Sequence, residues 1–321
     1  MGQVIGPKDE KAQSTTYRTT GRQDTKEKRV CRRQTEERGK MASTLSFSLR
    51  TFIKQFSPLS KRTRFNFPIR TSFKRLNVTC NSSRFLHFET LTSRQKDQVH
   101  LFVDALLQWN QKMNLTAITE VNEVMERHVE DSLAIIPPIR NLYLSHCSTI
   151  PCNDIKLVDV GTGAGLPGLI IAIACPEWHV TLMESMNKRC LFLEHAVGHT
   201  GLTNVQVVRG RAENLGHDLS LREKFDVVVA RAVAEMRILA EYCLPMVRVG
   251  GLFLAAKGHD PLAEVTNAGK AIEMMGASLL QICPVESHSP YGQRTAVVCF
   301  KERHTPRKYP RDPGTPAKAP L

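Results

Sequence analysis

No acidic residue occurs between Arg38 and Phe88, and no apolar run is longer than residues 169–175. A run of that length is far too short to cross a bilayer, so we expect no membrane partner. The nine cysteines are scattered and none forms a Cys-x-x-Cys pair. A disulfide scaffold, a structural zinc site or any other bound metal is therefore not expected. A stretch without acids is typical of a targeting segment rather than of a folded domain.

The basic charge of the chain is confined to its first part. The 321 residues carry a formal charge of +13, and residues 1–90 alone, with 20 basic and 7 acidic side chains, account for all of it. Residues 91–300 hold 18 basic and 22 acidic groups, a net of −4, and residues 301–321 hold 6 and 2, a net of +4. Any affinity of the folded part for RNA must therefore come from local placement of cations rather than from bulk charge.

The first ninety residues predict three segments. Residues 1–40 are polar and highly charged, so we expect them to be disordered, and translation starting at Met41 would make them an upstream extension. The window 41–88 holds 13 Ser/Thr and 9 Arg/Lys. This composition predicts a transit peptide over residues 41–80 and a linker over 81–90.

The sequence around the expected processing site favours one organelle. The start Met41-Ala42-Ser43 resembles that of chloroplast transit peptides, and Val78-Thr79-Cys80 resembles their processing sites. We therefore expect a chloroplast protein, with the mitochondrion as the alternative address. A disordered basic arm that binds RNA directly is the alternative role for this segment.

The remainder of the chain predicts an α/β fold with a helical start. Apolar spacing predicts helices over 91–115, with Thr92 or Ser93 as N-cap, and over 121–136, ending at Pro137-Pro138 before a loop. Short apolar strands then alternate with helices, and two strand-like runs follow one another at the end. This predicts a doubly wound, mostly parallel sheet with one antiparallel strand. The expected divisions are a helical appendage over 91–154, the main domain over 155–300 and a basic Pro-rich tail over 301–321.

A glycine-rich segment marks the expected cofactor site. The strand 156–160 runs into Gly161-Thr162-Gly163-Ala164-Gly165-Leu166-Pro167-Gly168. Strand, glycine turn and helix start are the geometry of a nucleotide-binding loop, because glycine allows a tight turn and a close approach of the ligand. Gly163 and Gly168 complete a dinucleotide fingerprint, whereas Asp159 followed by three alternate glycines resembles S-adenosylmethionine methyltransferases. The loop alone leaves both cofactors open.

Three acidic residues extend this site. Glu184 ends the second strand, 23 residues after Gly161, where a carboxylate accepts hydrogen bonds from the ribose of either cofactor. Glu213, in the segment 210–213 after the third strand, could face the adenine. Asp159 is either a turn former or a contact to the methionine end of the cofactor.

Many motifs together resemble one family, the RsmG (GidB) methyltransferases, over residues 91–321. The matching stretches are Trp109-Asn110, Asn114-Leu115-Thr116-Ala117-Ile118, His128-x-x-Asp131-Ser132-Leu133, Asp159 to Gly168, Glu184-Ser185, Lys188-Arg189, Arg211-Ala212-Glu213, Ala230-Arg231-Ala232-Val233-Ala234, Lys257-Gly258, Arg294, Thr305-Pro306, Lys308-Tyr309-Pro310-Arg311 and Pro313-Gly314. One departure is Glu184, where family members often have Asp.

The resemblance implies a fold, a cofactor and a reaction. It implies a seven-stranded, Rossmann-like methyltransferase sheet with a small N-terminal helical appendage, and S-adenosyl-L-methionine as cofactor. The implied reaction forms 7-methylguanosine in the 530 loop of 16S-type ribosomal RNA. With the loop motif, the expected cofactor-binding residues are Gly161, Gly163, Gly165, Leu166, Glu184, Ala212, Glu213 and Arg231.

The expected chemistry needs no general base. Guanine N7 is an unprotonated nucleophile, so catalysis should come mainly from positioning, and no catalytic residue is certain. Arg231 and Lys257 end two strands and are the candidates; a solvated charge or a salt bridge is the alternative for each. An Asn/Asp-Pro-Pro-aromatic motif would indicate methylation of an amino group, and residues 231–234 lack it.

The expected RNA contacts are cations near the site and in the tail. They are Lys257, Arg294, Arg307, Lys308 and Arg311, and truncation after Phe300 should cost RNA binding while sparing cofactor binding. Lys188 and Arg189 could contact phosphate or be surface charges. His128 and Asp131 lie three apart on one helix and could bond each other.

The expected partner is small-subunit ribosomal RNA, and we expect a monomer. The alternatives are a methyltransferase of another substrate on the same fold, or a non-catalytic organelle RNA-binding module.

Overall fold

The computed structural model describes residues 85–147, 153–286 and 294–321. The expected disordered segment, the transit peptide and the first part of the linker lie outside the described residues. Those that are described belong to one compact unit of the chain.

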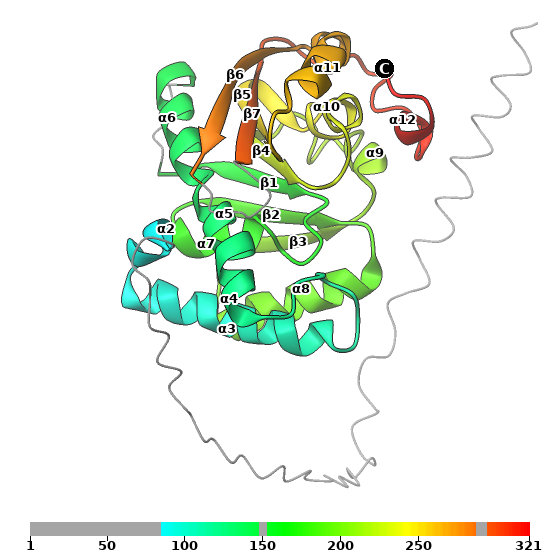
Figure 1. The fold of residues 1–321 in the computed structure, drawn as a ribbon. Helices are drawn as coiled ribbons and strands as arrows, with labels where there is room; N and C mark the ends of the chain where they lie inside the picture. Colours follow the sequence, from blue (N-terminus) through cyan, green and yellow to red (C-terminus); the bar gives the residue numbers. More distant parts are fainter. Residues whose placement is uncertain (1–84, 148–152, 287–293) are drawn as a thin grey trace, which may run out of the picture. The chain divides into compact units, whose positions relative to one another are not determined.

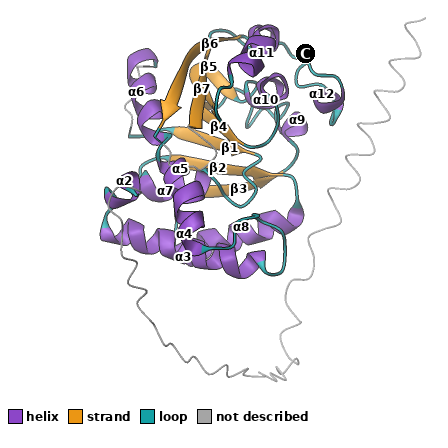
Figure 2. Ribbon diagram, viewed as in Figure 1, coloured by secondary structure: helices purple, strands orange, loops and turns teal. Residues whose placement is uncertain are grey.

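A seven-stranded sheet forms the centre of this unit (Figures 1 and 2). Its strand order is β3-β2-β1-β4-β5-β7-β6, and β7 is antiparallel to both of its neighbours, whereas the strands from β3 to β5 pair in parallel. The predicted mostly parallel sheet is confirmed, and its antiparallel strand lies inside the sheet. The strands are β1 (Lys156–Val160), β2 (His179–Glu184), β3 (Val205–Arg209), β4 (Phe225–Arg231), β5 (Val247–Lys257), β6 (Ala277–Val285) and β7 (Arg294–Lys301).

Helices cover both faces of the sheet, as Figure 1 shows. One layer contains α2 (Leu86–Glu89), α3 (Ser93–Asn110), α4 (Val121–Val124), the π-helix η1 (Met125–Glu130), α5 (Asp131–Leu133), α6 (Ile136–His146), α7 (Gly168–Ala174) and α8 (Asn187–Thr200). The other contains α9 (Ala212–Leu215), α10 (Met236–Cys243), α11 (Leu262–Met274) and, at its end, α12 (Thr315–Lys318). In the described part of the chain, no helix is both long and apolar enough for a membrane span.

The alternation of side chains along each strand builds a separate core under each helical layer. Leu157 and Leu254 point into the core beneath α3, α7 and α8, whereas their neighbours Val158 and Phe253 point into the core beneath α10 and α11. All four side chains are buried. A strand covered on both faces must be apolar at successive positions, which is why the strand runs are continuous rather than alternating.

The N-terminal helices are part of the first layer rather than a separate appendage. Phe102 of α3 is fully buried in the same core as Val227 of the sheet. The expected N-cap is confirmed at Thr92, which forms a capping box with Gln95. The Gln95 amide also donates to the carbonyls of Ile173 and Ala174, which ties the start of α3 to the end of α7.

The chain after Pro137-Pro138 differs from the prediction. Instead of a loop to residue 154, α6 begins at Ile136 and carries both prolines in its first turn. Proline fits there because the first N–H groups of a helix have no intrahelical partner to lose. Tyr143 of α6 is buried and donates a hydrogen bond to Asp226, 3.0 Å away.

The C-terminal tail is folded onto the second layer. Lys301 is fully buried and donates to the Leu244 carbonyl at 2.6 Å, and Tyr309 is only 5% exposed. A truncation after Phe300 would remove these side chains from the protein interior. The expectation that such a truncation would cost RNA binding while sparing cofactor binding stays a prediction.

Candidate functional site

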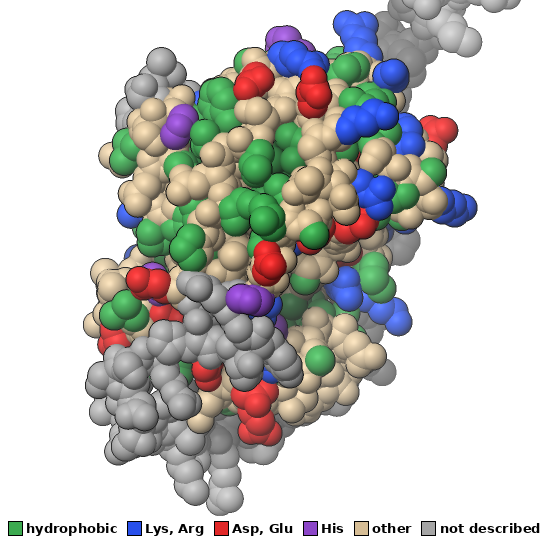
Figure 3. Space-filling model, turned by 45° about the horizontal axis from the view of Figure 1, so that its top comes forward, with side chains coloured by type: hydrophobic (Ala, Val, Ile, Leu, Met, Phe, Trp, Pro, Cys, Tyr) green, Lys and Arg blue, Asp and Glu red, His purple; other side chains and the backbone are tan. Residues whose placement is uncertain are grey.

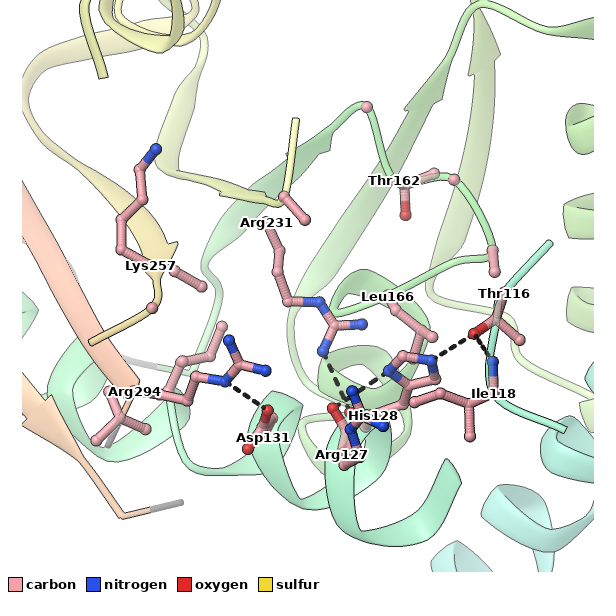
Figure 4. Close-up of a pocket in the computed structure, with 18 of the residues that line it drawn as sticks. Thr116, Ile118, Arg127, His128, Asp131, Thr162, Leu166, Arg231, Lys257 and Arg294 are labelled. Carbon is pink, nitrogen blue, oxygen red and sulfur yellow. Dashed lines mark hydrogen bonds and ion pairs between the residues drawn. The ribbon is translucent and has the colours of Figure 1, made fainter. Parts of the chain in front are cut away.

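Two adjoining cavities open at the carboxyl ends of the strands. The larger, of about 420 Å³, lies against the ends of β1, β4 and β5 and against η1 (Figure 4). The smaller, of about 170 Å³, lies against the ends of β1, β2 and β3. Gly161 lines both cavities, so a ligand that spans the glycine loop would reach from one into the other. This is the edge of the sheet where open α/β folds bind ligands.

The glycine loop has a backbone that other residues rarely adopt. Gly161, Gly163 and Gly165 have φ values of 70°, 61° and 85°. A Cβ on Gly161 would lie 2.9 Å from Val233, and one on Gly165 would lie 2.3 Å from Leu169. A Cβ on Gly163 would meet nothing closer than 3.9 Å, and this residue lines the larger cavity. Glycine at 161 and 165 permits the packing, whereas glycine at 163 keeps space open for a ligand.

Asp159 holds the loop from behind. Its Oδ2 accepts hydrogen bonds from the Thr162 hydroxyl at 2.6 Å and from the Gly168 N–H at 2.8 Å. The side chain is fully buried and lines neither cavity. Burial raises the pKa of this carboxyl to about 6, although both hydrogen bonds oppose the rise. Of the two roles considered for Asp159, the geometry supports the turn former.

Glu184 is placed in the same way on the next strand. It accepts hydrogen bonds from the N–H groups of Gly163, at 3.1 Å, and of Ser185 and Met186, both at 2.8 Å. Its carboxylate therefore joins the glycine loop to the start of α8. Like Gly165, it lines neither cavity in this structure, so its contact to a ribose stays a prediction.

The smaller cavity brings Ala212 and Glu213 together with Tyr242. Glu213 is only 3% exposed, and its Oε1 accepts from the Arg211 guanidinium at 3.1 Å and from the Gly314 N–H at 2.9 Å. Burial alone would raise the pKa of this carboxyl, but these two donors outweigh it and lower the pKa. Glu213 is therefore held as a carboxylate at the wall of the cavity.

The larger cavity collects Leu166 with three predicted cations, Arg231, Lys257 and Arg294. Arg294 Nε lies 3.3 Å from Asp131 Oδ2, and Arg231 donates to the Ser132 hydroxyl at 3.3 Å (Figure 4). Burial lowers the pKa of Arg231, and the neighbouring Asp131 partly offsets this. Both guanidiniums therefore line the cavity, one from β4 and the other from β7.

His128 lies at the same wall with a partner other than the one expected. Its Nε2 is 2.8 Å from Thr116 Oγ1, and its Nδ1 is 3.2 Å from the Arg127 carbonyl. The carbonyl can only accept, so we assign the ring proton to Nδ1, and Nε2 accepts from the Thr116 hydroxyl. Asp131 pairs with Arg294 instead. The expected bond between His128 and Asp131 is therefore wrong.

Two features explain why His128 stays neutral. Burial is the larger cause and the nearby Arg231 the next; together they lower the pKa of His128 to about 4.

His128 lies in the π-helix η1, whose wider turns change the direction of side chains relative to an α-helix. A spacing rule for α-helices could not have placed His128 and Asp131 correctly.

Lys257 is engaged within the protein. Its Nζ donates to the Ala234 carbonyl at 2.8 Å and to Glu264 Oε1 at 2.6 Å, and Figure 4 shows its ammonium directed away from Arg231 and Arg294. These bonds hold the segment after Arg231, where Ala232 has a φ of 55° and lines the larger cavity. Of the roles considered for Lys257, the structure supports the salt bridge. An RNA contact by Lys257 stays a prediction.

The tail cations lie away from both cavities. Arg307 and Lys308 are exposed, and on the face in Figure 3 the Lys and Arg side chains gather on the side where Figure 1 places α12. Arg311 instead binds Glu241 through Nε and Nη2, at 2.9 and 2.7 Å. RNA contacts by Arg307 and Lys308 stay predictions, whereas the guanidinium of Arg311 is occupied by a buried carboxylate.

Two further wall residues, Thr116 and Arg189, belong to motifs found in the sequence but were not predicted to line this cavity. Thr116 is presented by a loop that Asn110 organises, since the Asn110 amide accepts from the N–H groups of Leu115 and Thr116 and donates to the Thr116 carbonyl. The motif from Asn110 to Thr116 is the sequence feature that marks this loop. Arg189 was considered only as a phosphate contact or a surface charge.

Comparison with known proteins identifies the family. The GidB family, described as rRNA small subunit methyltransferase G, matches residues 95–291. This chain belongs to the GidB family. Ribosomal RNA small subunit methyltransferase G of Brevibacillus brevis is 41% identical over 233 residues, 72% of this chain and 93% of that protein. The protein of the same name from Acetivibrio thermocellus is 42% identical over 72% of this chain and 90% of its own length.

One solved structure aligns with part of this chain. The fibrillarin pre-rRNA processing protein of Methanococcus jannaschii aligns with a TM-score of 0.39 and 18% identity, over 47% of this chain and 68% of that chain. The GidB-family chain is therefore an S-adenosylmethionine-dependent methyltransferase of small-subunit ribosomal RNA.

The residues at the two cavities fit this cofactor. Gly163 leaves open the space that a side chain would fill, and Gly161 forms a wall common to both cavities. The smaller cavity, with the carboxylate of Glu213 and the ring of Tyr242, suits an adenosyl group. The cofactor supplies an electrophilic methyl group on a sulfonium, and the larger cavity is the place for its acceptor.

Substitution of Gly163 by alanine tests the cofactor site. Gly163→Ala should weaken S-adenosylmethionine binding about tenfold or more, measured by isothermal titration, because the new methyl group occupies the cavity. Because the backbone at position 163 is left-handed, alanine there should also lower the free energy of unfolding by about 1 kcal/mol.

Gly201→Ala is the matched control. Gly201 has nearly the same φ, 66°, ends α8, and has nothing within 4 Å of its Cβ position. It should show the same loss of stability with unchanged cofactor binding. Equal cofactor affinities in the two variants would contradict the site.

The neutral His128 predicts a pH dependence of stability. Its pKa of about 4 in the folded protein lies below the ordinary histidine value of 6.5, so the unfolded chain binds the proton first as pH falls. Stability should therefore drop between pH 6.5 and 4, by up to ~3 kcal/mol from this group. His128→Gln should lose this part of the pH dependence in urea unfolding; parallel curves for the two proteins would refute the assignment.

Proposed function

We propose that this protein forms 7-methylguanosine in the 530 loop of the small-subunit ribosomal RNA of an organelle, and that this organelle is the chloroplast. The observation that carries the choice of guanine N7 is the absence of a free base at the larger cavity. Among the described residues that line it, Asp131 is the only acidic one, and it is paired with Arg294. A nucleophile that must lose a proton would need an acceptor here, whereas N7 needs none.

The arrangement of His128 supports the same choice. Both ring nitrogens are engaged, Nδ1 with the Arg127 carbonyl and Nε2 with the Thr116 hydroxyl. With a pKa lowered to about 4, the imidazole is a weak base at neutral pH. We propose that His128 holds in place the part of the cavity wall that faces the target base. The rate enhancement would then come from holding N7 in line with the methyl group.

The cations at the rim support an RNA substrate for this cavity. Arg231 and Arg294 face it from two strands, and Arg189 adds a third guanidinium from α8. Guanidinium groups bind phosphate through a planar pair of donors, which suits the backbone around a splayed base.

The proposal is tested by mapping 7-methylguanosine. Organelle small-subunit RNA from plants with and without the gene should be cleaved chemically at 7-methylguanosine, and the 530-loop guanine should be methylated only when the gene is present. A guanine that stays methylated without the gene would disprove the assigned target. Recombinant protein tested on naked RNA and on small-subunit particles would then identify the form of the substrate.

The chloroplast address has its own test. The acid-poor, Ser/Thr-rich composition of residues 41–80 supports a transit peptide. Mass spectrometry of the protein isolated from chloroplasts should give a mature N-terminus near Cys80. A mature chain that starts before residue 60, or its recovery from mitochondria alone, would contradict this part of the proposal.

A further inference from the structure

The C-terminal tail reaches the wall of the smaller cavity. The N–H of Gly314 donates to Glu213 Oε1 at 2.9 Å, and Glu213 lines that cavity together with Ala212 and Tyr242. Gly314 adopts a left-handed backbone, with φ at 84°, just before α12. The tail, whose basic Pro-rich sequence is typical of an RNA-binding arm, thus contacts the carboxylate of Glu213 at the smaller cavity.

The tail is fixed on the N-terminal side of this contact. Arg311 binds the carboxylate of Glu241, whose side chain is 1% exposed, at 2.7 Å, and the backbone N–H of Arg311 donates to the same group at 2.7 Å. Glu241 precedes Tyr242 on α10, so the pair ties the tail to a helix that itself lines the smaller cavity. The salt bridge is buried on one side and bidentate, which is the strong form of such a pair.

A second set of bonds joins the tail to α9 and the loop after it. The Arg222 guanidinium donates to the carbonyl of Gly216 at 2.6 Å and to those of Tyr309 and Thr305, both at 2.8 Å. Pro310 packs so closely on Gly216 that a Cβ there would lie 2.6 Å from its ring. The helix that carries Ala212 and Glu213 is therefore held from outside by residues 305–314.

We propose that the Arg311–Glu241 pair is a positioning device for the cofactor: it holds Gly314 against Glu213, and so fixes the wall that receives the adenosyl group. Two of the hydrogen bonds to Glu213 end on Oε1, from Arg211 and from Gly314, and the Tyr242 side chain also bonds this residue. With that oxygen held by two donors, the carboxylate has one orientation in the cavity. Release of the tail would let it rotate without changing any residue that lines the cavity.

The test measures cofactor affinity in four variants of the full chain. S-adenosylhomocysteine is the probe, since it carries the adenosyl group and cannot react. Arg311→Ala should weaken its binding about tenfold in isothermal titration. Lys318→Ala is the control, because it removes an exposed cation from the same tail, in α12. It should leave the affinity unchanged.

A double-mutant cycle distinguishes positioning from general damage. Glu213→Gln alone should weaken binding, and the addition of Arg311→Ala to it should cause little further loss, because the tail acts through Glu213. Additive losses, or an equal loss in Lys318→Ala, would overturn the proposal. Should Arg311→Ala fail to fold, Arg311→Lys keeps the charge without the fork and should weaken binding about threefold; unchanged affinity would count against the proposal.

Discussion

Two buried carboxylates hold one glycine loop, and the site depends on them. Asp159 ends β1 and accepts N–H and hydroxyl donors from both ends of the loop, while Glu184 ends β2 and accepts the N–H in its middle. The N–H groups of Gly163 and Gly168 donate to these two carboxylates, whereas that of Gly161 donates to the Met183 carbonyl. Because parallel strands end at the same edge, both carboxylates reach the loop from adjacent strands, and Gly161 becomes the shared wall of both cavities.

The sequence predicts those parts of the fold that local periodicity determines. Apolar runs identified the seven strands and the main helices, and the absence of a helix between the last two runs indicated the antiparallel strand. Pro137-Pro138 was interpreted as a stop, although proline is equally suited to the first turn of α6. The tail was interpreted by its charge, because its buried lysine and tyrosine have no periodic apolar pattern around them.

Long-range pairing limits the prediction of the site. Glycines and strand-end residues could be placed, because a parallel sheet puts the ends of its strands together. The ion-pair partner of a cation could not be predicted. Arg294 and its partner Asp131 are 163 residues apart, and Lys257 pairs with Glu264 on the following helix. His128 illustrates a second limit: the π-helix that carries it has no signature in hydrophobic spacing, so the α-helical rule predicted the wrong neighbour.

The electrostatics of the larger cavity separate two tasks. The methyl transfer proposed above would leave a positive charge on the guanine ring, and a cavity lined by unpaired guanidiniums would oppose it. Here the carboxylate of Asp131 offsets the charge of Arg294, and that of Glu264 offsets the charge of Lys257. The imidazole of His128 is neutral, because its pKa is lowered to about 4. The remaining guanidinium charge suits phosphates rather than the base. In a body with a net charge of −4, the cations that line this cavity therefore supply positive charge locally, where an RNA substrate would bind.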